Sequence, residues 1–222
     1  PEVQPITQLV ARDRVDQAVL LPSFVYFPHA SEGKLALPWN ANVAAAVGAY
    51  ARRRAAESPA RVVASSKSWL SNSSIDRRAP LLPLGVPDDI EPISPVDAAF
   101  HILDHIGQSF GAAEADGTDL GDQEVILTVP ASFDAAAREH TVEAARAAGL
   151  GQLTLLEEPQ AAFYAWLDRR GEAWRSELSV GDVVLVVDVG GGTTDFAAIL
   201  LTEEDGRPWI VHGSMGGEIQ PQ

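Results

Sequence analysis

The sequence predicts an α/β protein, and three observations support this prediction. Between residues 123 and 169, apolar stretches of strand type alternate with segments of helical periodicity, which is typical of parallel strands joined by crossover helices. After residue 181, three apolar stretches follow one another across short turns, which indicates an antiparallel meander. The composition, with 46% apolar and 21% charged residues, is that of a globular chain.

Extended segments are expected first, at Pro5–Ala11 and Ala18–Phe27. A proline within the second segment either divides it or places it at a sheet edge, because proline cannot donate to a strand ladder. Asn40 or Asn42 is then expected to cap a helix over Val43–Glu57, whose apolar residues fall at helical spacing.

A sharper helix signal comes at Ser94, which is followed by Pro95 and by an acid three positions on. This near capping box predicts a helix that runs to about Gly111. Before it, Ser65–Leu70 is expected to form one or two helical turns, and residues 71–93 read as a loop rich in proline and glycine.

In the second half of the chain we expect five strands and two helices, with a polar connector at Gly171–Val180. The expected strands are Glu124–Val129, Gln152–Leu156, Asp182–Val187, Phe196–Leu201 and Trp209–His212. The expected helices run from a cap at Asp134 to about Ala148 and from Pro159 to about Arg169.

Charge and composition exclude several classes of function. Acidic residues outnumber basic ones by 31 to 16, and the resulting net charge of −15 argues against nucleic-acid and anionic-membrane partners. No cysteine is present, so disulfides and thiol nucleophiles are excluded. The longest strongly apolar run, Val183–Val187, is far shorter than the roughly 18 residues that span a bilayer. The chain starts without methionine or a signal-peptide pattern, and we expect a cytoplasmic piece of a longer protein.

The strongest chemical signal is a glycine-rich turn between two apolar strands. It reads Asp188, Val189, Gly190, Gly191, Gly192, Thr193, Thr194 and Asp195. Consecutive backbone N–H groups in such a turn form a concavity that binds anions, and the carboxylates beside it suit a hydrated Mg²⁺ on a nucleotide. The turn matches neither the Walker loop nor the dinucleotide fingerprint. The alternative is a glycine-rich hairpin with solvated acids at its ends.

Several stretches carry a family resemblance. VVLVVDVGGGTTDFAAI resembles the second phosphate-binding segment of the actin-like ATPase superfamily, in detail that of the seventy-kilodalton heat-shock chaperones (DnaK type). ILTVPASFDAAAREHTVEAARAAGLGQLTLLEEPQAAFYAW is similar to the family's strand, Val-Pro turn, helix, strand and Glu-Pro helix, and SPVDAAFHILDHIGQSFG to the preceding helix. Fainter similarity in ARVVASSKSWL and LLPSFVYF extends the resemblance over nearly the whole chain.

The resemblance implies a role for each matching residue. Asp188 and Asp195 correspond to the aspartates that hold magnesium through water and assist the attacking water, and Glu158 to a carboxylate that holds the metal-bound water. The amides of Gly190, Gly191 and Gly192, with Thr193 and Thr194, correspond to the donors to the phosphates. Lys67 corresponds to a lysine that reaches the γ-phosphate, and Arg138 to an arginine that couples the nucleotide state to the substrate domain.

The residues alone leave other interpretations open. Glu157 and Glu158 are also acids at a helix N-terminus, where the macrodipole favours negative charge. Lys67 is alternatively a solvated surface lysine, and Arg138 an exposed helical arginine. His101 and His105, spaced i and i+4, could share a metal, but no third ligand is apparent and a polar helix face is favoured.

The resemblance also implies an architecture, an α/β ribonuclease-H-like (actin-like ATPase) sheet with flanking helices. Residues 1–170 are then an incomplete first lobe with a mostly helical outer subdomain at about 28–120, 171–181 a connector, and 182–222 the opening meander of the second lobe. The family's first phosphate-binding hairpin is not found in the sequence. We therefore expect the 222 residues to bind nucleotide weakly or not at all by themselves.

The implied function is ATP binding and hydrolysis in a chaperone. ATP or ADP and Mg²⁺ are the expected cofactors, with K⁺ as a further ion, and client polypeptides and co-chaperones are the expected partners of the complete protein. Two rivals stay open. One is a sugar or acetate kinase of the same superfamily, and the other is a degenerate module that binds proteins without catalysis.

Overall fold

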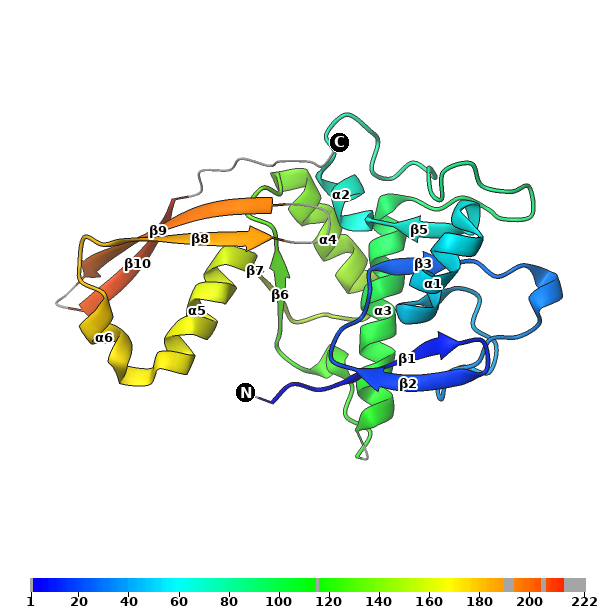
Figure 1. Cartoon of the computed structure of the whole chain (residues 1–222), viewed down its shortest axis with the longest axis horizontal. Coiled ribbons are helices and arrows are strands. Elements are labelled where there is room, and N and C mark those ends of the chain that lie inside the picture. The colour runs from blue at the N-terminus through cyan, green and yellow to red at the C-terminus, as the bar shows by residue number, and fades with distance from the viewer. Residues whose placement is uncertain (1, 115, 190–193, 205–206, 214–222) are drawn as a thin grey trace. The chain divides into compact units, whose positions relative to one another are not determined.

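The computed structural model describes residues 2–114, 116–189, 194–204 and 207–213. Contacts divide the chain into two compact units. Unit 1 comprises Pro1–Val125 and Glu139–Leu153, and unit 2 comprises Ile126–Arg138 and Thr154–Gln222. The fold is mixed α/β, as predicted, and its described strands form sheets of two or three strands each (Figure 1).

The elements follow one another along the chain as labelled in Figure 1. The strands are β1 (Ile6–Ala11), β2 (Arg14–Ala18), β3 (Phe24–Tyr26), β4 (Ala46–Val47), β5 (Val62–Ala64), β6 (Val125–Val129), β7 (Leu153–Glu157), β8 (Val183–Val189), β9 (Thr194–Glu204) and β10 (Arg207–Gly213). The α-helices are α1 (Ala49–Glu57), α2 (Ser66–Ser71), α3 (Pro95–Ala113), α4 (Ala135–Ala147), α5 (Glu158–Arg170) and α6 (Trp174–Glu177). Short 3-10 turns cover Ala30–Glu32, Pro59–Arg61, Leu120–Asp122 and Gly171–Ala173.

Unit 1 is built around strand β3, the middle strand of the sheet β4-β3-β5. Successive side chains of a strand point to opposite faces, so Val25 and Tyr26 join two different hydrophobic clusters. Helix α1 contributes Tyr50 to the cluster with Tyr26, and α3 contributes Ala98 to the cluster with Val25. The sheet therefore has a core on each face. The region expected as a mostly helical subdomain, at about 28–120, contains α1, α2 and α3 and only the two short strands β4 and β5, so its regular structure is mostly helical. Its role as an outer subdomain stays a prediction.

The helix expected over Val43–Glu57 begins later than predicted, at Ala49. Ala46–Val47 instead pairs with β3 as strand β4, because these residues are fully buried between the two clusters. Gly48 then turns the chain with a φ of 98°, a conformation that favours glycine. The prediction failed because alanine and valine fit the helical pattern locally, while burial in the sheet decides their conformation.

The extended segment expected at Pro5–Ala11 is confirmed as β1. Strand β2, which was not predicted, pairs with β1 as an antiparallel hairpin, with Ile6 opposite Ala18. All five β2 residues are exposed, so no apolar pattern marks the strand in the sequence. In the Ala18–Phe27 segment, strand β3 begins at Phe24, beyond Pro22, and residues 19–23 are not strand. Because β3 is the middle strand of its sheet, the sheet-edge alternative is wrong.

Helix α3 confirms the capping box read from the sequence. The Ser94 hydroxyl accepts from the Asp97 amide at 3.0 Å, and the Asp97 carboxylate accepts from the Ser94 amide at 3.0 Å. The reciprocal bonds satisfy N–H groups that a helix N-terminus otherwise leaves unpaired. The helix runs slightly further than predicted, to Ala113.

Strands β6 and β7 are hydrogen-bonded neighbours connected through α4. The Val125 amide, at the first residue of β6, donates to Gln152 O, just before β7, at 2.8 Å, so the two strands run in the same direction. Asp134 caps α4 as predicted, its carboxylate accepting from the Ala137 amide at 2.7 Å. The carboxyl ends of both strands therefore lie at the same edge.

Unit 2 carries the predicted meander. Its sheet has the order β10-β9-β8, and both pairings are antiparallel. Helix α5 packs on one face, where Phe163 and Trp166 contact a cluster that includes Ile199 and Val186. The expected polar connector before β8 is itself partly helical, because Trp174 and Leu178 of this stretch pack against the same cluster.

None of the helices in the described parts of the chain combines the length and apolar character that a membrane crossing requires.

Candidate functional site

The two aspartates of the glycine-rich turn lie directly opposite each other on neighbouring strands. Asp188 of β8 pairs in register with Asp195 of β9, and Val189 with Thr194. Paired residues of an antiparallel ladder point to the same face, with Cβ atoms about 4.5–5.5 Å apart. Asp195 is only 7% exposed and Asp188 is half-buried, so two carboxylates converge at the mouth of the turn.

The turn itself lies outside the described residues. The residues outside are Gly190, Gly191, Gly192 and Thr193. For Thr194, the structure describes only the backbone, which begins β9. The predicted phosphate contacts of these residues therefore stay predictions. What the structure does describe is the pair of strands that hold the two ends of the turn together.

Glu158 is the first residue of α5 and is half-buried. The chain runs from the end of α5 through α6 to the start of β8, so the start of α5 lies toward the other end of β8, where Asp188 is. Figure 1 shows α5 beginning beside the arrowhead of β8. Glu158, as the first residue of α5, therefore lies toward the Asp188 end of β8, and its part in the site stays a prediction.

The donor set is made of carboxylate oxygens, which suit a hard cation such as Mg²⁺. Within the described residues, no group of three or more His, Cys, Asp or Glu side chains is arranged to hold a metal ion directly. Two carboxylates are compatible with an ion that retains most of its water, which is the usual state of Mg²⁺ beside phosphates.

Arg138 and Glu157 form an ion pair that the sequence analysis did not anticipate. Arg138, in the first turn of α4, donates to the Glu157 carboxylate at 2.7 Å and to Phe133 O at 3.1 Å. Glu157 is the N-cap residue of α5 but makes no capping bond with its side chain. The pair therefore fastens the start of α4 to the end of β7, beside Glu158. The predicted coupling role of Arg138 is not tested by these contacts.

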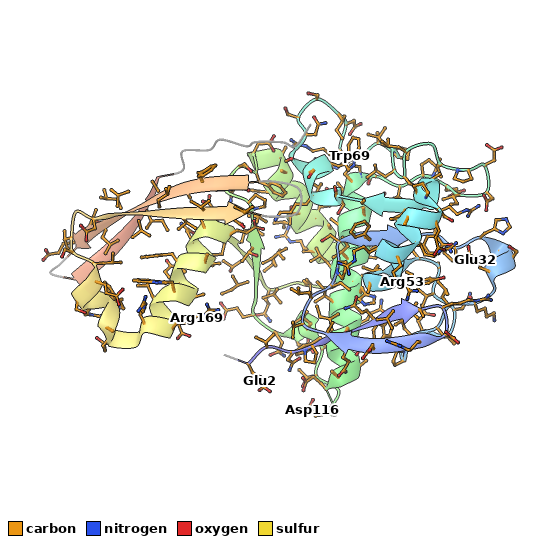
Figure 2. All side chains as sticks on the ribbon, in the orientation of Figure 1. Glu2, Glu32, Arg53, Trp69, Asp116 and Arg169 are labelled. Carbon is orange, nitrogen blue, oxygen red and sulfur yellow. The ribbon has the colours of Figure 1, made fainter. Side chains whose placement is uncertain are left out.

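Lys67 lies in unit 1, as the second residue of α2, and its side chain is exposed. The N-cap residue before this helix, Ser65, has a φ of 55°, in the left-handed region that non-glycine residues seldom adopt. Ser65 O accepts from the Ser68 amide at 2.9 Å and from the Trp69 amide at 3.2 Å. Figure 2 labels Trp69 in this helix. No signal in the sequence marked this strained turn, because serine is common in ordinary helix caps.

The two histidines considered as metal ligands point into unit 1. His105 is 5% exposed, and its Nε2 donates to Thr7 O at 2.9 Å, while the His101 ring packs against Phe27 and Phe100. Burial lowers the pKa of both rings, which favours their neutral forms. The favoured polar helix face is wrong, because the pair faces the interior.

Comparison with known proteins identifies the family. A family model described as Hsp70 protein matches residues 37–207, more than half of the chain. The chain belongs to the Hsp70 family. Curated relatives carry the name Chaperone protein HscA. The protein from Enterobacter sp. (strain 638) is 38% identical over 170 residues, which is 70% of this chain and 25% of the relative. That from Klebsiella pneumoniae subsp. pneumoniae is 35% identical over 206 residues, or 87% of this chain and 31% of the relative.

The chain thus spans about a quarter to a third of the length of these Hsp70 relatives. The matched residues include the Asp188–Asp195 hairpin, Glu158, Arg138 and Lys67. Membership of the Hsp70 family implies an actin-like ATPase fold, and the mixed α/β architecture of both units is consistent with it.

Proposed function

We propose that this chain is part of the nucleotide-binding region of an Hsp70-type chaperone that binds and hydrolyses ATP. The observation that supports the proposal is the in-register pair Asp188 and Asp195, which closes a triglycine turn and carries one of its carboxylates in a buried position. Carboxylates held beside successive backbone N–H groups match a metal-bound polyphosphate.

The residues fit Mg²⁺ held through water by Asp188 and Asp195, with Glu158 placed to bind the metal-bound water. When bound, Mg²⁺ neutralises negative charge that develops on the transferred phosphoryl group. Asp195 is almost excluded from solvent, which would restrict the orientations of its carboxylate toward a metal-bound water. K⁺ as a further ion stays a prediction from the resemblance.

The remaining roles are electrostatic. The amides of Gly190, Gly191 and Gly192, with the hydroxyls of Thr193 and Thr194, donate to the phosphates. Lys67 stabilises charge on the γ-phosphate and orients the attacking water. Water attacks the γ-phosphorus, the bond to the β-phosphate oxygen breaks, and ADP and inorganic phosphate are the products.

Coupling to protein clients is proposed for the complete protein. Arg138 joins the start of α4 to Glu157, the residue before Glu158, so a change at the nucleotide could reach the α4 surface along this ion pair. Client polypeptides and co-chaperones are the proposed partners.

We also propose a ribonuclease-H-like sheet, since the order β10-β9-β8 is compatible with its opening meander. A cytoplasmic location stays a prediction.

The test is ATP turnover by the full-length protein carrying Asp188→Asn or Thr193→Ala. Each change removes a charge or donor that acts on the reacting phosphates, and we expect turnover to fall by about 10²-fold with little effect on thermal unfolding. Glu203→Gln, an exposed carboxylate on β9, serves as the matched control and should leave turnover unchanged. Unchanged turnover in the Asp188→Asn and Thr193→Ala proteins would contradict the proposal.

Two other outcomes separate the rival functions. ATP consumption that requires a sugar or a carboxylate substrate would identify a phosphotransferase. A full-length protein that does not bind ATP at all would favour a module that has kept the fold for protein binding.

A further inference from the structure

Unit 1 contains a small cavity of about 190 Å³ between α3 and the segment that leads into β4. Its polar and aromatic lining comes from Trp39, Asn40, Phe100, His101, Asp104, His105 and Gln108. The volume lies below the roughly 300–1,000 Å³ of a site for a drug-sized ligand, so the occupant is a single ring or a group the size of a side chain.

His105 gives this cavity a hydrogen-bond acceptor. Its Nε2 bonds to Thr7 O at 2.9 Å, and because a carbonyl only accepts, Nε2 carries the hydrogen. The other ring nitrogen, Nδ1, is then a lone-pair acceptor in the neutral ring. Within the described part of the chain no hydrogen bond to Nδ1 is found, and His105 is one of the residues that line the cavity.

Asp104 gives the cavity a negative charge. One of its carboxylate oxygens, Oδ2, accepts from Gln108 Nε2 at 2.6 Å, which fixes the side chain one turn along α3. The described residues place no arginine or lysine in an ion pair with Asp104. Asp104 is half-buried as a residue, although its hydrogen bond with Gln108 lies at an exposed position, and its negative charge attracts a cation in the cavity.

Trp39 forms the aromatic wall. Its ring meets the His105 ring edge to face, with centroids 5.5 Å apart, so its orientation is fixed by packing. Tryptophan is the aromatic side chain with the strongest attraction for a cation over its ring face. The cavity therefore combines the His105 ring, one aromatic surface, and a carboxylate that is hydrogen-bonded to Gln108 but has no arginine or lysine partner among the described residues.

We propose that this cavity binds a planar organic cation of the amidinium or guanidinium class. The N–H groups of the cation donate to Asp104 and to His105 Nδ1, and its plane lies against Trp39. The Asp104 carboxylate would repel an anion. A neutral isostere would lack the electrostatic attraction to the Asp104 carboxylate and to the Trp39 ring. The cavity lies wholly within unit 1 and shares no residue with the proposed nucleotide site.

The test follows the backbone and indole N–H resonances of the 222-residue chain by NMR during titration at neutral pH. Benzamidinium is the free probe and a blocked Gly-Arg-Gly peptide is the peptide-borne probe. Benzamide and benzoate have nearly the same shape as benzamidinium but carry no charge or a negative one. We expect saturable shifts of the Trp39 indole, assigned with Trp39→Phe, and at least about 10-fold weaker binding of benzamide and benzoate.

Asp104→Asn should weaken binding of the cationic probe at least about 10-fold, whereas Asp13→Asn, an exposed acid in the β1–β2 turn, should not. The spectra of the unliganded variants report whether each is folded. Binding by benzamidinium alone assigns the site to a free compound, and binding by the peptide alone assigns it to an arginine side chain. Failure of both probes to bind, equal affinity for benzamide, or no effect of Asp104→Asn in a folded variant would overturn the proposal.

Discussion

Tyr26 ends strand β3 with its ring fully buried and its hydroxyl in a polar cluster. The hydroxyl donates to the Glu32 carboxylate and accepts from Arg54 at 3.0 Å, and the Arg54 guanidinium lies 5.0 Å from the centre of the Tyr26 ring. Figure 2 labels Glu32 in the short turn that brings its carboxylate to this cluster. Burial and the hydrogen bond to Glu32 raise the pKa of Tyr26 to about 12.

This raised pKa predicts a loss of stability in alkaline solution. The protonated hydroxyl of Tyr26 is favoured in the folded chain, so its contribution is fully present below the unfolded pKa of about 10 and is lost as the pH rises toward about 12. We expect the difference in tyrosinate absorbance between the wild-type chain and Tyr26→Phe to have its midpoint near pH 12. A midpoint near pH 10 would show that the hydroxyl is not held in this cluster.

Helix α1 depends on a tight corner that sequence periodicity did not show. Gly48 has no capping side chain, and Gln8 of β1 supplies the cap instead, its Oε1 accepting from the Ala49 amide at 2.9 Å. Gln8 Nε2 also donates to Leu20 O at 2.9 Å. A Cβ atom at Gly48 would lie 2.5 Å from Gln8 Oε1, so both the positive φ and the packing require glycine.

Gly48→Ala is therefore expected to lower the free energy of unfolding by about 1–3 kcal/mol, measured by urea denaturation. Gly85→Ala is the matched control, because Gly85 also has a positive φ, of 66°, but nothing lies within 4 Å of an added Cβ. If the two variants lose the same stability, the contact with Gln8 contributes nothing beyond backbone strain.

The capping box of α3 makes a second prediction at the level of an element. Ser94→Ala removes the hydroxyl that accepts from the Asp97 amide, and Ser94 is buried, so water cannot easily replace it. We expect a loss of about 1 kcal/mol in the free energy of unfolding. Ser94→Thr retains a capping oxygen and should recover most of that loss. Equal losses for both variants would argue against the cap.

The helices and strands show what a local pattern can predict. Helices α3 and α4 were predicted almost to the residue, because Ser94 and Asp134 are caps whose effect is confined to one turn. Strands β2 and β4 were missed. The first carries no apolar pattern, and the second adopts its conformation because it is buried between two distant segments. Such long-range causes leave no periodic trace in the sequence.

At the level of the whole molecule, unit 2 exposes one face of its sheet. The side chains of β8 and β9 that point away from α5 include six that are large, apolar and exposed; they are Val183, Leu185, Val187, Val189, Phe196 and Leu200. Strand β8 is also an edge strand within the described sheet, with no proline or lysine to block pairing. Faces and edges of this kind favour self-association.

We therefore expect the 222-residue chain to self-associate as its concentration rises, and Leu185→Lys to reduce this association in sedimentation velocity experiments. Leu84→Lys is the matched control, because Leu84 in unit 1 is 64% exposed, compared with 63% for Leu185. Equal effects of the two lysine variants would mean that net charge, and not the β8 face, controls the association.

The candidate site was only partly predictable. Asp188 and Asp195 were placed correctly because a strand, a short turn and a returning strand bring the ends of the turn together by local geometry. The position of Glu158 depends on how α5 packs against β8, which a local pattern does not predict. The ion pair of Arg138 with Glu157 joins residues nineteen positions apart, so it was not predicted either. Lys67 belongs to a different unit, and its part in the site stays a prediction.

The central claim is that the Asp188 and Asp195 pair seats the metal of a bound nucleotide. Its most direct measurement is the Mg²⁺ dependence of ADP affinity in the full-length protein, determined by isothermal titration calorimetry with and without the double change Asp188→Asn and Asp195→Asn. We expect Mg²⁺ to strengthen ADP binding by the wild-type protein and to have almost no effect on the double variant. The same gain in affinity with Mg²⁺ in both proteins would contradict the account.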